Sequence, residues 1–371
     1  MKYFSFDIYK GTKQYFKFFD VYIKQFETNK AKIFDELFIN NSSYRRARGT
    51  EQNVGKEIIG KLSKYYGLSI PTSNQIYVLE KVINRLYKNI YYKVDDFGRD
   101  QFEVIAKELE NSLLFPVINL FKLFISLNSS KSPKNALVEN MEAYFDVKKY
   151  RDFFIDELLE ILEIESLFFD EDHDDSSYVN TFYNPMSYQI LASKCYAKEK
   201  YIESIYFSIQ AKEILLKDQN FKRYITVNHT LMSSMLYTKN YNECLDLVTK
   251  HIMCVKSLGL EKQELLICNK YLYVSLLGLG DYKKIINDLK DEEGFNLTIL
   301  TCLLVSLYKI SKDNLYKDYI NNHINIVELG DKNKDFIHCL TNYLSTHDRK
   351  QLIKLKSFDL AQFIIPILKN I

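Results

Sequence analysis

Residues 188–201 read YQILASKCYAKEKY, residues 228–241 read NHTLMSSMLYTKNY, and residues 269–282 read NKYLYVSLLGLGDY. Each stretch is an apolar segment of helical spacing that breaks at a short polar turn, and a tyrosine opens the next helix. The three tyrosines follow one another at 40 and 41 residues: Tyr201, Tyr241 and Tyr282. This recurrence predicts stacked helix pairs from Pro185 onward, although a heptad or bundle arrangement would share the same periodicity.

Helical spacing of apolar residues continues over nearly the whole chain of 371 residues, which has only five prolines and eleven glycines. Alternation typical of strands is rare, so the fold class is all-α. Six helices are expected before the repeats in addition to those within residues 28–68, and the chain would divide at a linker, residues 67–72, where Gly67 ends a helix and Pro71 cannot continue one. The domains are residues 1–70 and 71–371. The expected helices span 13–26, 74–92, 98–114, 115–127, 134–146 and 149–168.

A basic segment, SSYRRAR at residues 42–48, places three arginines among seven residues. Ser42 is expected to cap a short helix whose Tyr44 and Ala47 face inward. An outward basic face of this kind suits the major groove of DNA, where Arg pairs with guanine and Ser donates or accepts. The candidate DNA-binding residues are Ser42, Ser43, Arg45, Arg46 and Arg48. The alternative is a basic helical hairpin that binds no nucleic acid.

The net charge of +2 hides an asymmetry between the two ends of the chain. Residues 1–70 contain thirteen Lys and Arg against seven acidic residues, an excess of +6, which leaves −4 for the remainder. A basic N-terminal region on a slightly acidic body is typical of binding to a polyphosphate at one end.

Residues 28–37, 42–48 and 59–68 resemble the second, third and closing helices of the helix-turn-helix in Cro/repressor-type regulators. The segment departs from that pattern in three places: Phe34 stands where a small residue is preferred, Phe38 replaces the turn glycine, and Arg48 replaces a frequent glutamate. Because a bulky side chain resists positive φ, we expect the turn at Phe38 to be reshaped. The repeats from Pro185 are similar to tetratricopeptide repeats, with a longer spacing.

The combination of these two modules resembles the cytosolic peptide-pheromone receptors of Gram-positive bacteria and their phages, which include the Rgg, PlcR, PrgX and AimR regulators. The resemblance implies a cytoplasmic, homodimeric transcription regulator that takes part in quorum sensing. Its N-terminal domain would bind double-stranded DNA. Its right-handed tetratricopeptide-like solenoid would bind a short signalling peptide and form the dimer.

The repeat register assigns a set of side chains to the concave face of such a solenoid, built from the first helix of each pair. Asn228 and Asn269 share a repeat position, and an amide can clamp a peptide backbone because it both donates and accepts. The alternative is that both asparagines tie adjacent helices. The candidate peptide-binding residues are Gln189, Ser193, Tyr196, Asn228, His229, Ser233, Tyr237, Asn269 and Lys270.

Motifs of catalysis and cofactor binding are absent from the sequence, so we expect neither an enzyme nor a cofactor. Six histidines (173, 229, 251, 323, 338 and 347) offer no ligand spacing, and the acidic loop at residues 170–177 fits no EF-hand, so no metal site is predicted. A repeat-based protein-interaction module without DNA binding remains the alternative, either a Rap-like binder of response regulators or an adaptor.

Targeting signals are also missing. The chain has no run of 18 apolar residues, and its N-terminus lacks the layout of a signal peptide, so we expect no membrane contact. The six cysteines form no CxxC, and most lie within apolar helical patterns. They are expected to be small buried hydrophobes in a reducing cytosol.

Overall fold

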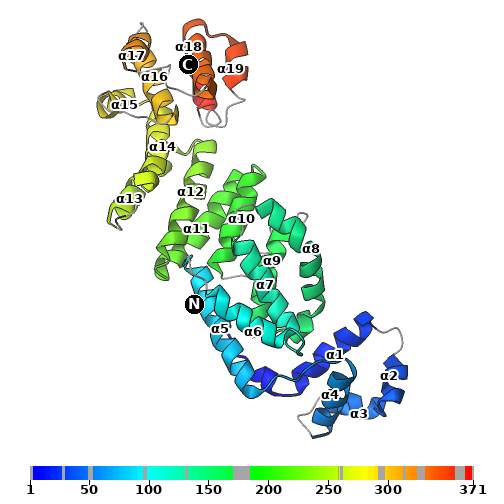
Figure 1. The fold of residues 1–371 in the computed structure, drawn as a ribbon. Helices are drawn as coiled ribbons and strands as arrows, with labels where there is room; N and C mark the ends of the chain where they lie inside the picture. The colour runs from blue at the N-terminus through cyan, green and yellow to red at the C-terminus, as the bar shows by residue number, and fades with distance from the viewer. Residues whose placement is uncertain are drawn as a thin grey trace. The chain divides into compact units, whose positions relative to one another are not determined.

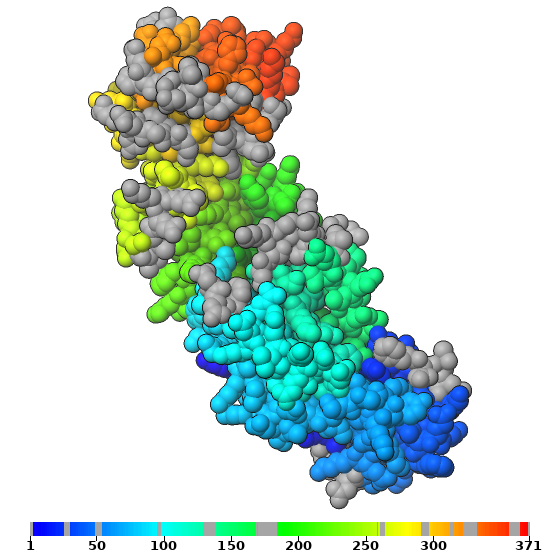
Figure 2. Space-filling view, in the orientation of Figure 1, coloured from blue at the N-terminus to red at the C-terminus, as the bar shows by residue number. Residues whose placement is uncertain are grey.

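The computed structural model describes residues 3–26, 30–48, 53–94, 98–129, 133–169, 184–257, 259, 262–290, 297–311, 315–323, 331–355 and 364–369; the others are grey in Figure 2. Over these ranges the fold is all-helical and contains no β-strand, which confirms the predicted class (Figure 1). The chain forms two compact units, residues 1–191 with 214–223, and residues 192–213 with 224–371.

The helices of the first unit begin with a short 3-10 turn and end in a helix shared with the second unit. They are η1 (Asp7–Lys10), α1 (Lys13–Phe26), α2 (Lys30–Glu36), α3 (Asn41–Ala47), α4 (Asn53–Tyr65), α5 (Ser73–Tyr91), α6 (Arg99–Leu109), α7 (Phe115–Ser129), α8 (Pro133–Lys149), η2 (Arg151–Phe153), α9 (Asp156–Phe169) and α10 (Pro185–Ala197).

The remaining helices carry the repeats and the C-terminal region. They are α11 (Tyr201–Lys217), α12 (Phe221–Tyr237), α13 (Tyr241–Ser257), α14 (Lys262–Leu279), α15 (Tyr282–Leu289), α16 (Leu297–Ser311), α17 (Leu315–His323), α18 (Asp331–Thr346), α19 (Arg349–Leu355) and α20 (Ile365–Leu368).

Two predicted helices of the first unit are shorter than expected. The helix predicted at 98–114 ends at Leu109. The Ser112 hydroxyl donates to the Leu109 carbonyl (2.7 Å), and its oxygen accepts from the Leu114 amide (3.1 Å). These two hydrogen bonds close a turn that ends the helix. The helix predicted at 149–168 begins only at Asp156. Here Phe153 is fully buried, and its carbonyl accepts from the Tyr9 hydroxyl (3.2 Å), so the preceding chain forms the 3-10 turn η2.

The predicted linker at residues 67–72 is tied to the rest of the first unit. Gly67 ends α4 with φ +68°, and the Leu68 amide donates back to the Ser63 carbonyl (2.8 Å), as expected for a glycine that terminates a helix. Ser69 then pairs with a later turn, donating to the Asn111 carbonyl (2.8 Å) and accepting from the Leu113 amide (3.0 Å). Both sides of the linker belong to one unit, and the domain division at residue 70 stays a prediction.

The predicted helix pairs are present, and the turns inside them are closed in the same way. Two residues before the second helix of each pair, the backbone is left-handed. The amide of the residue that follows donates to the carbonyl five residues before it. The left-handed residues are Glu199 (φ +60°), Lys239 (φ +61°) and Gly280 (φ +77°). The closing bonds are Lys200 to Cys195 (2.8 Å), Asn240 to Met235 (2.9 Å) and Asp281 to Leu276 (3.0 Å).

Packing around the turns repeats as well. The Ser204 hydroxyl donates to the Ala192 carbonyl (2.8 Å), and Cys244, at the same repeat position, directs its thiol to the Met232 carbonyl (3.7 Å). Tyr241, which opens α13, lies against Gly278, where an added Cβ would meet its ring at 2.6 Å. These contacts recur from one helix pair to the next, while the right-handed, tetratricopeptide-like solenoid stays a prediction.

Apolar side chains from Leu231 to Leu368 form one core in the second unit, where α13 packs on α14 and α16 packs on both α14 and α15. Five of the six cysteines are buried and Cys254 is half-buried; all six are free thiols, which confirms the prediction of burial for most of them. Among the described helices, none has the length and apolar character needed to span a bilayer.

Candidate functional site

Helix α3, which carries the arginines of residues 42–48, begins at Asn41 and is capped by the residue before it. Asn40 has an extended backbone (φ −75°, ψ 130°), and its side-chain oxygen accepts from the Ser42 amide at 2.9 Å. The prediction that Ser42 caps the helix is therefore wrong. Asparagine is as strong an N-cap as serine, and its position leaves Ser42 exposed on the first turn.

The inner face of α3 is the predicted one, because Tyr44 and Ala47 are both 2% exposed. The Tyr44 ring contacts Phe16 of α1 edge-on (centroids 5.1 Å apart) and Phe34 of α2 at a tilt (4.9 Å). Aromatic contacts of this kind contribute about 0.5–1.5 kcal/mol each beyond the buried area. Phe34, unexpected at a position that prefers small residues, therefore helps to hold α3 against α2.

The turn between α2 and α3 has the left-handed backbone that the helix-turn-helix pattern requires, even though a phenylalanine occupies it. Phe38 has φ +51°, and the Ile39 amide donates to the Phe34 carbonyl at 2.7 Å. Our expectation of a reshaped turn is wrong at this point. The Phe38 side chain is 90% exposed, so only the local cost of about 1–2 kcal/mol for a left-handed residue has to be met.

The outer face of α3 carries most of the predicted DNA-binding side chains. Ser42, Arg45, Arg46 and Arg48 are exposed, and Ser43 is half-buried. Arg46 directs its Nε to the Ser42 carbonyl one turn earlier, at a long 3.5 Å.

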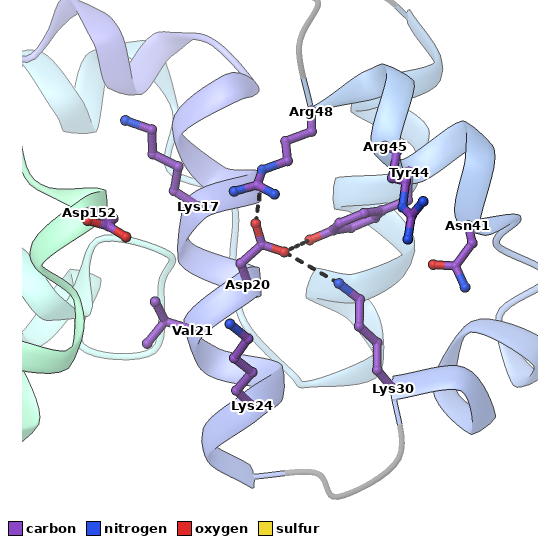
Figure 3. A pocket seen from close by; sticks show the side chains of 10 residues that line it. All are labelled: Lys17, Asp20, Val21, Lys24, Lys30, Asn41, Tyr44, Arg45, Arg48 and Asp152. Atoms are coloured by element: carbon purple, nitrogen blue, oxygen red, sulfur yellow. Dashed lines mark hydrogen bonds and ion pairs between the residues drawn. The ribbon is translucent and has the colours of Figure 1, made fainter.

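Asp20 of α1 connects this face to its surroundings (Figure 3). One carboxylate oxygen accepts from the Tyr44 hydroxyl (3.1 Å) and lies 3.4 Å from Lys30 Nζ, and the other lies 3.1 Å from Arg48 Nε. Burial, and then the Asp20 charge, raise the pKa of Tyr44, so the phenol stays protonated and donates. Arg48 is therefore held by an ion pair with Asp20.

A pocket of about 400 Å³ opens beside Asp20, between α1, α2 and α3 (Figure 3). Its cationic side chains outnumber its carboxylates by five to two, and they come from all three helices. A site with this balance favours an anion, and a phosphate group fits both the charge and the donors. The lining residues are Lys17, Asp20, Val21, Lys24, Lys30, Asn41, Tyr44, Arg45, Arg48 and Asp152.

The candidate peptide-binding residues lie in varied environments. In the first unit, Gln189 accepts from Arg223 Nη1 (3.0 Å). In the second unit, the Ser233 hydroxyl shares a hydrogen bond with the Tyr271 hydroxyl (3.0 Å), and the Tyr237 ring stacks on Tyr201 at 4.3 Å. Ser193 is exposed, whereas Tyr196 and Lys270 are half-buried, and burial lowers the pKa of Lys270.

The two asparagines that share a repeat position differ. Asn228 is fully buried, with its Nδ2 3.0 Å from His251 Nδ1 on the next helix, whereas Asn269 is half-buried. A peptide cannot reach a fully buried amide without displacing its neighbours. The position of Asn228 therefore favours the interpretation in which it ties adjacent helices.

A cluster that the sequence did not predict lies beside Asn228. His229 of α12, His251 of α13, and Glu264 and Cys268 of α14 bring one ligand-type atom each within 4.8 Å of the others. Burial raises the pKa of the Cys268 thiol to about 12 and lowers that of His251. The only local signal was Glu264 and Cys268 one helical turn apart, because the histidines come from other helices.

Several predicted features lie outside the described residues, among them Thr28 and Asn29 of the expected second helix and the acidic loop at 170–177. For the chain as a whole, comparison with known protein families, with curated proteins and with solved structures finds no match.

Proposed function

We propose that the protein is a transcriptional regulator that binds double-stranded DNA through α3. The observation that carries the proposal is the division of this helix into two faces. Tyr44 packs against α1 and α2 and Ala47 is buried, whereas Ser42, Arg45 and Arg46 are left exposed beside a pocket rich in cations. A short helix held rigidly by two others is what presentation to a major groove requires.

From their positions we assign different tasks to neighbouring arginines. Arg45 lines the pocket with the lysines of α1 and α2, so it is suited to a backbone phosphate. Arg46 and Ser42 do not line that pocket and are suited to base edges. Arg48 is neutralised by Asp20 and contributes mainly to holding α3 in place.

The helix pairs of the second unit support a further part of the proposal, in which a short signalling peptide binds to the repeats and changes the affinity for DNA. Exposed Ser193 and half-buried Tyr196, Tyr237 and Asn269 are the predicted residues best placed to meet it. Buried Asn228 is better suited to joining helices.

Fluorescence anisotropy of the full chain with labelled genomic duplexes tests DNA binding. We expect affinity that falls steeply with salt, because released counterions drive phosphate contacts. Arg46→Ala should relax sequence preference at a cost of about 1–3 kcal/mol, whereas Arg45→Ala should weaken binding to all sequences alike.

The matched control is Arg349→Ala/Lys350→Ala, which removes two exposed cations from α19 and should leave DNA binding unchanged. If a folded Arg45→Ala/Arg46→Ala variant binds duplexes as the wild type does, α3 is not the DNA-contacting helix. The alternative, a repeat-based interaction module or adaptor, would then be favoured.

A homodimer forms the last part of the proposal. Single helix-turn-helix units bind weakly, and paired units contact half-sites about 34 Å apart, one turn of DNA. Light scattering at micromolar concentration should give twice the chain mass of 44.0 kDa. A monomer both with and without DNA would count against it.

A further inference from the structure

The cluster of His229, His251, Glu264 and Cys268 in the second unit has the composition of a metal site. Imidazole nitrogens, a thiol and a carboxylate are the donors that Zn²⁺ takes in proteins, and four of them complete its tetrahedral coordination. They come from three successive helices, α12, α13 and α14. A metal bound here would join two helix pairs of the repeat.

The distances are close to those of a tetrahedral site. The Glu264 carboxylate oxygen lies 2.5 Å from His229 Nε2 and 3.6 Å from His251 Nε2, and all four ligand-type atoms lie within 4.8 Å of one another. Ligand atoms around Zn²⁺ lie roughly 3.3–3.8 Å apart, given bonds of about 2.0–2.3 Å. Side-chain movements of about 1 Å would therefore suffice.

The orientation of His251 is set from outside the cluster. Its Nδ1 lies 3.0 Å from the amide of Asn228, while its Nε2 faces Glu264. Asn228 Oδ1 is buried and makes no hydrogen bond within the described part of the chain. A half-turn of the amide exchanges its oxygen and nitrogen, so Oδ1 would accept from Nδ1–H. That bond fixes the tautomer with a free Nε2 lone pair, as do the residues that accept a hydrogen bond from the other ring nitrogen of a metal-bound histidine.

Two members of the cluster are buried and the other two are partly exposed, so solvent reaches the cluster past His229 and Glu264. His251 and Cys268 are at most 1% exposed, whereas the side chains of His229 and Glu264 are 23% and 19% exposed. An ion can therefore enter past His229 and Glu264 and be held by the two deeper ligands. Glu264 Oε1 and His251 Nε2 are buried and lie close to each other, and Oε1 also lies close to His229, but neither atom has a well-aligned hydrogen bond among the described residues, so ligation would satisfy both.

We propose that His229, His251, Glu264 and Cys268 bind one Zn²⁺ ion, which fastens α12, α13 and α14 together. Four protein ligands leave no position for a substrate, so the site is structural rather than hydrolytic. The proposal does not depend on DNA or peptide binding.

Titration of the metal-stripped full chain with Co²⁺ provides the test. We expect one ion per chain, tetrahedral bands in the visible region, thiolate-to-metal charge transfer in the near ultraviolet, and displacement of Co²⁺ by Zn²⁺. Zn²⁺ should also raise the melting temperature by several degrees, because it binds only the folded chain.

Two variants and one control assign the ligands. Cys268→Ser should abolish the charge-transfer band, and His229→Gln, at the exposed rim, should weaken Co²⁺ binding at least 100-fold. Cys244→Ser, which changes a buried thiol of α13 outside the cluster, should keep the wild-type spectrum. Absence of Co²⁺ binding by the folded wild type, or a charge-transfer band that survives Cys268→Ser, overturns the proposal. Since His229→Gln leaves the buried ligands in place, it decides the matter even if Cys268→Ser fails to fold.

Discussion

Asp20 in the first unit and Glu264 in the second are similarly buried carboxylates with opposite neighbours. Their side chains are 17% and 19% exposed, and each lies among residues from three helices. Asp20 is surrounded by Lys30, Arg48 and a tyrosine hydroxyl, whereas Glu264 faces two imidazoles and a thiol.

The difference in the neighbours decides what each site can bind. Lysine and arginine keep their charge at all physiological pH values, so their excess around Asp20 attracts anions. An unprotonated imidazole is neutral, and a thiol loses its proton when it binds a metal. Both then offer lone pairs, so the groups around Glu264 suit a metal cation. The type of the neighbouring side chains, and not the carboxylate or its burial, distinguishes a site suited to phosphate from a site suited to a metal.

Exchanging each carboxylate for its amide should have its largest effect at the second site. Glu264→Gln removes both a ligand and the charge that balances the ion, so Co²⁺ affinity should fall at least about 100-fold. That loss exceeds the usual effect of changing a residue that only hydrogen-bonds to a ligand. Asp20→Asn should leave Co²⁺ affinity unchanged. Equal losses in both variants, measured by visible absorption, would mean that the ion binds nonspecifically.

Asn228, the buried amide beside the metal-type cluster, is expected to matter for folding. Asn228→Ala leaves His251 Nδ1 without its partner and should cost about 1–3 kcal/mol, which lowers the melting temperature by several degrees. Asn269→Ala, at the equivalent but half-buried position, is the control and should change it little. A peptide affinity that falls while the melting temperature stays constant would restore Asn228 as a peptide clamp.

Glu165 of α9 is a third carboxyl, fully buried, and it makes no hydrogen bond within the described residues. Burial raises its pKa well above the ordinary value, so the folded chain keeps this proton after the unfolded chain has lost it at about pH 4.3. The stability it contributes is therefore present below that pH and is lost as the pH rises.

The leucine variant Glu165→Leu should remove this pH dependence. In melting curves between pH 5 and 8, it should gain stability over the wild type as the pH rises. Glu139→Leu, at an exposed carboxyl of α8, should show no such trend. A difference in melting temperature between variant and wild type that stays constant with pH would contradict the raised pKa of Glu165.

The smallest effect is expected at Asp20. Asp20→Asn keeps an acceptor for Tyr44 but releases Arg48 and Lys30, so affinity for duplex DNA at low salt should rise a few-fold. The slope of log affinity against log salt concentration should become steeper by about 0.9 for each additional phosphate contact. The loss of stability should stay within about 1 kcal/mol, as for other partly exposed ion pairs. Asp7→Asn removes an exposed carboxylate elsewhere and should change neither quantity.

Periodicity predicted the elements better than it predicted their ends. The bounds of α1 and the inward positions of Tyr44 and Ala47 follow from apolar spacing alone, because one face of a helix must be buried. The cap of α3 was misplaced by two residues, since Asn40 and Ser42 are both good caps and sequence does not rank them. The turn at Phe38 was misjudged because exposure of its side chain limits the cost of positive φ.

The cluster around Glu264 could not be predicted from spacing. His229 and His251 reach it only because α12, α13 and α14 pack side by side in the repeat, and a ligand set spread over three helices leaves no local motif. The charge around Asp20 was partly predictable, since the basic excess of residues 1–70 is visible in composition. Its concentration into one pocket required the positions of α1 and α2.

The identical closure of the turns at Glu199, Lys239 and Gly280 has a consequence for how such a chain can change in length. A segment that runs from one of these turns to the next ends in the backbone geometry in which it began, so it can be duplicated or deleted as a whole without a new junction. Growth by units of 40 or 41 residues would keep each second-helix tyrosine in register with the pair that follows it. The repeat is thus a modular part of the chain, and its length can evolve independently of the basic helix α3.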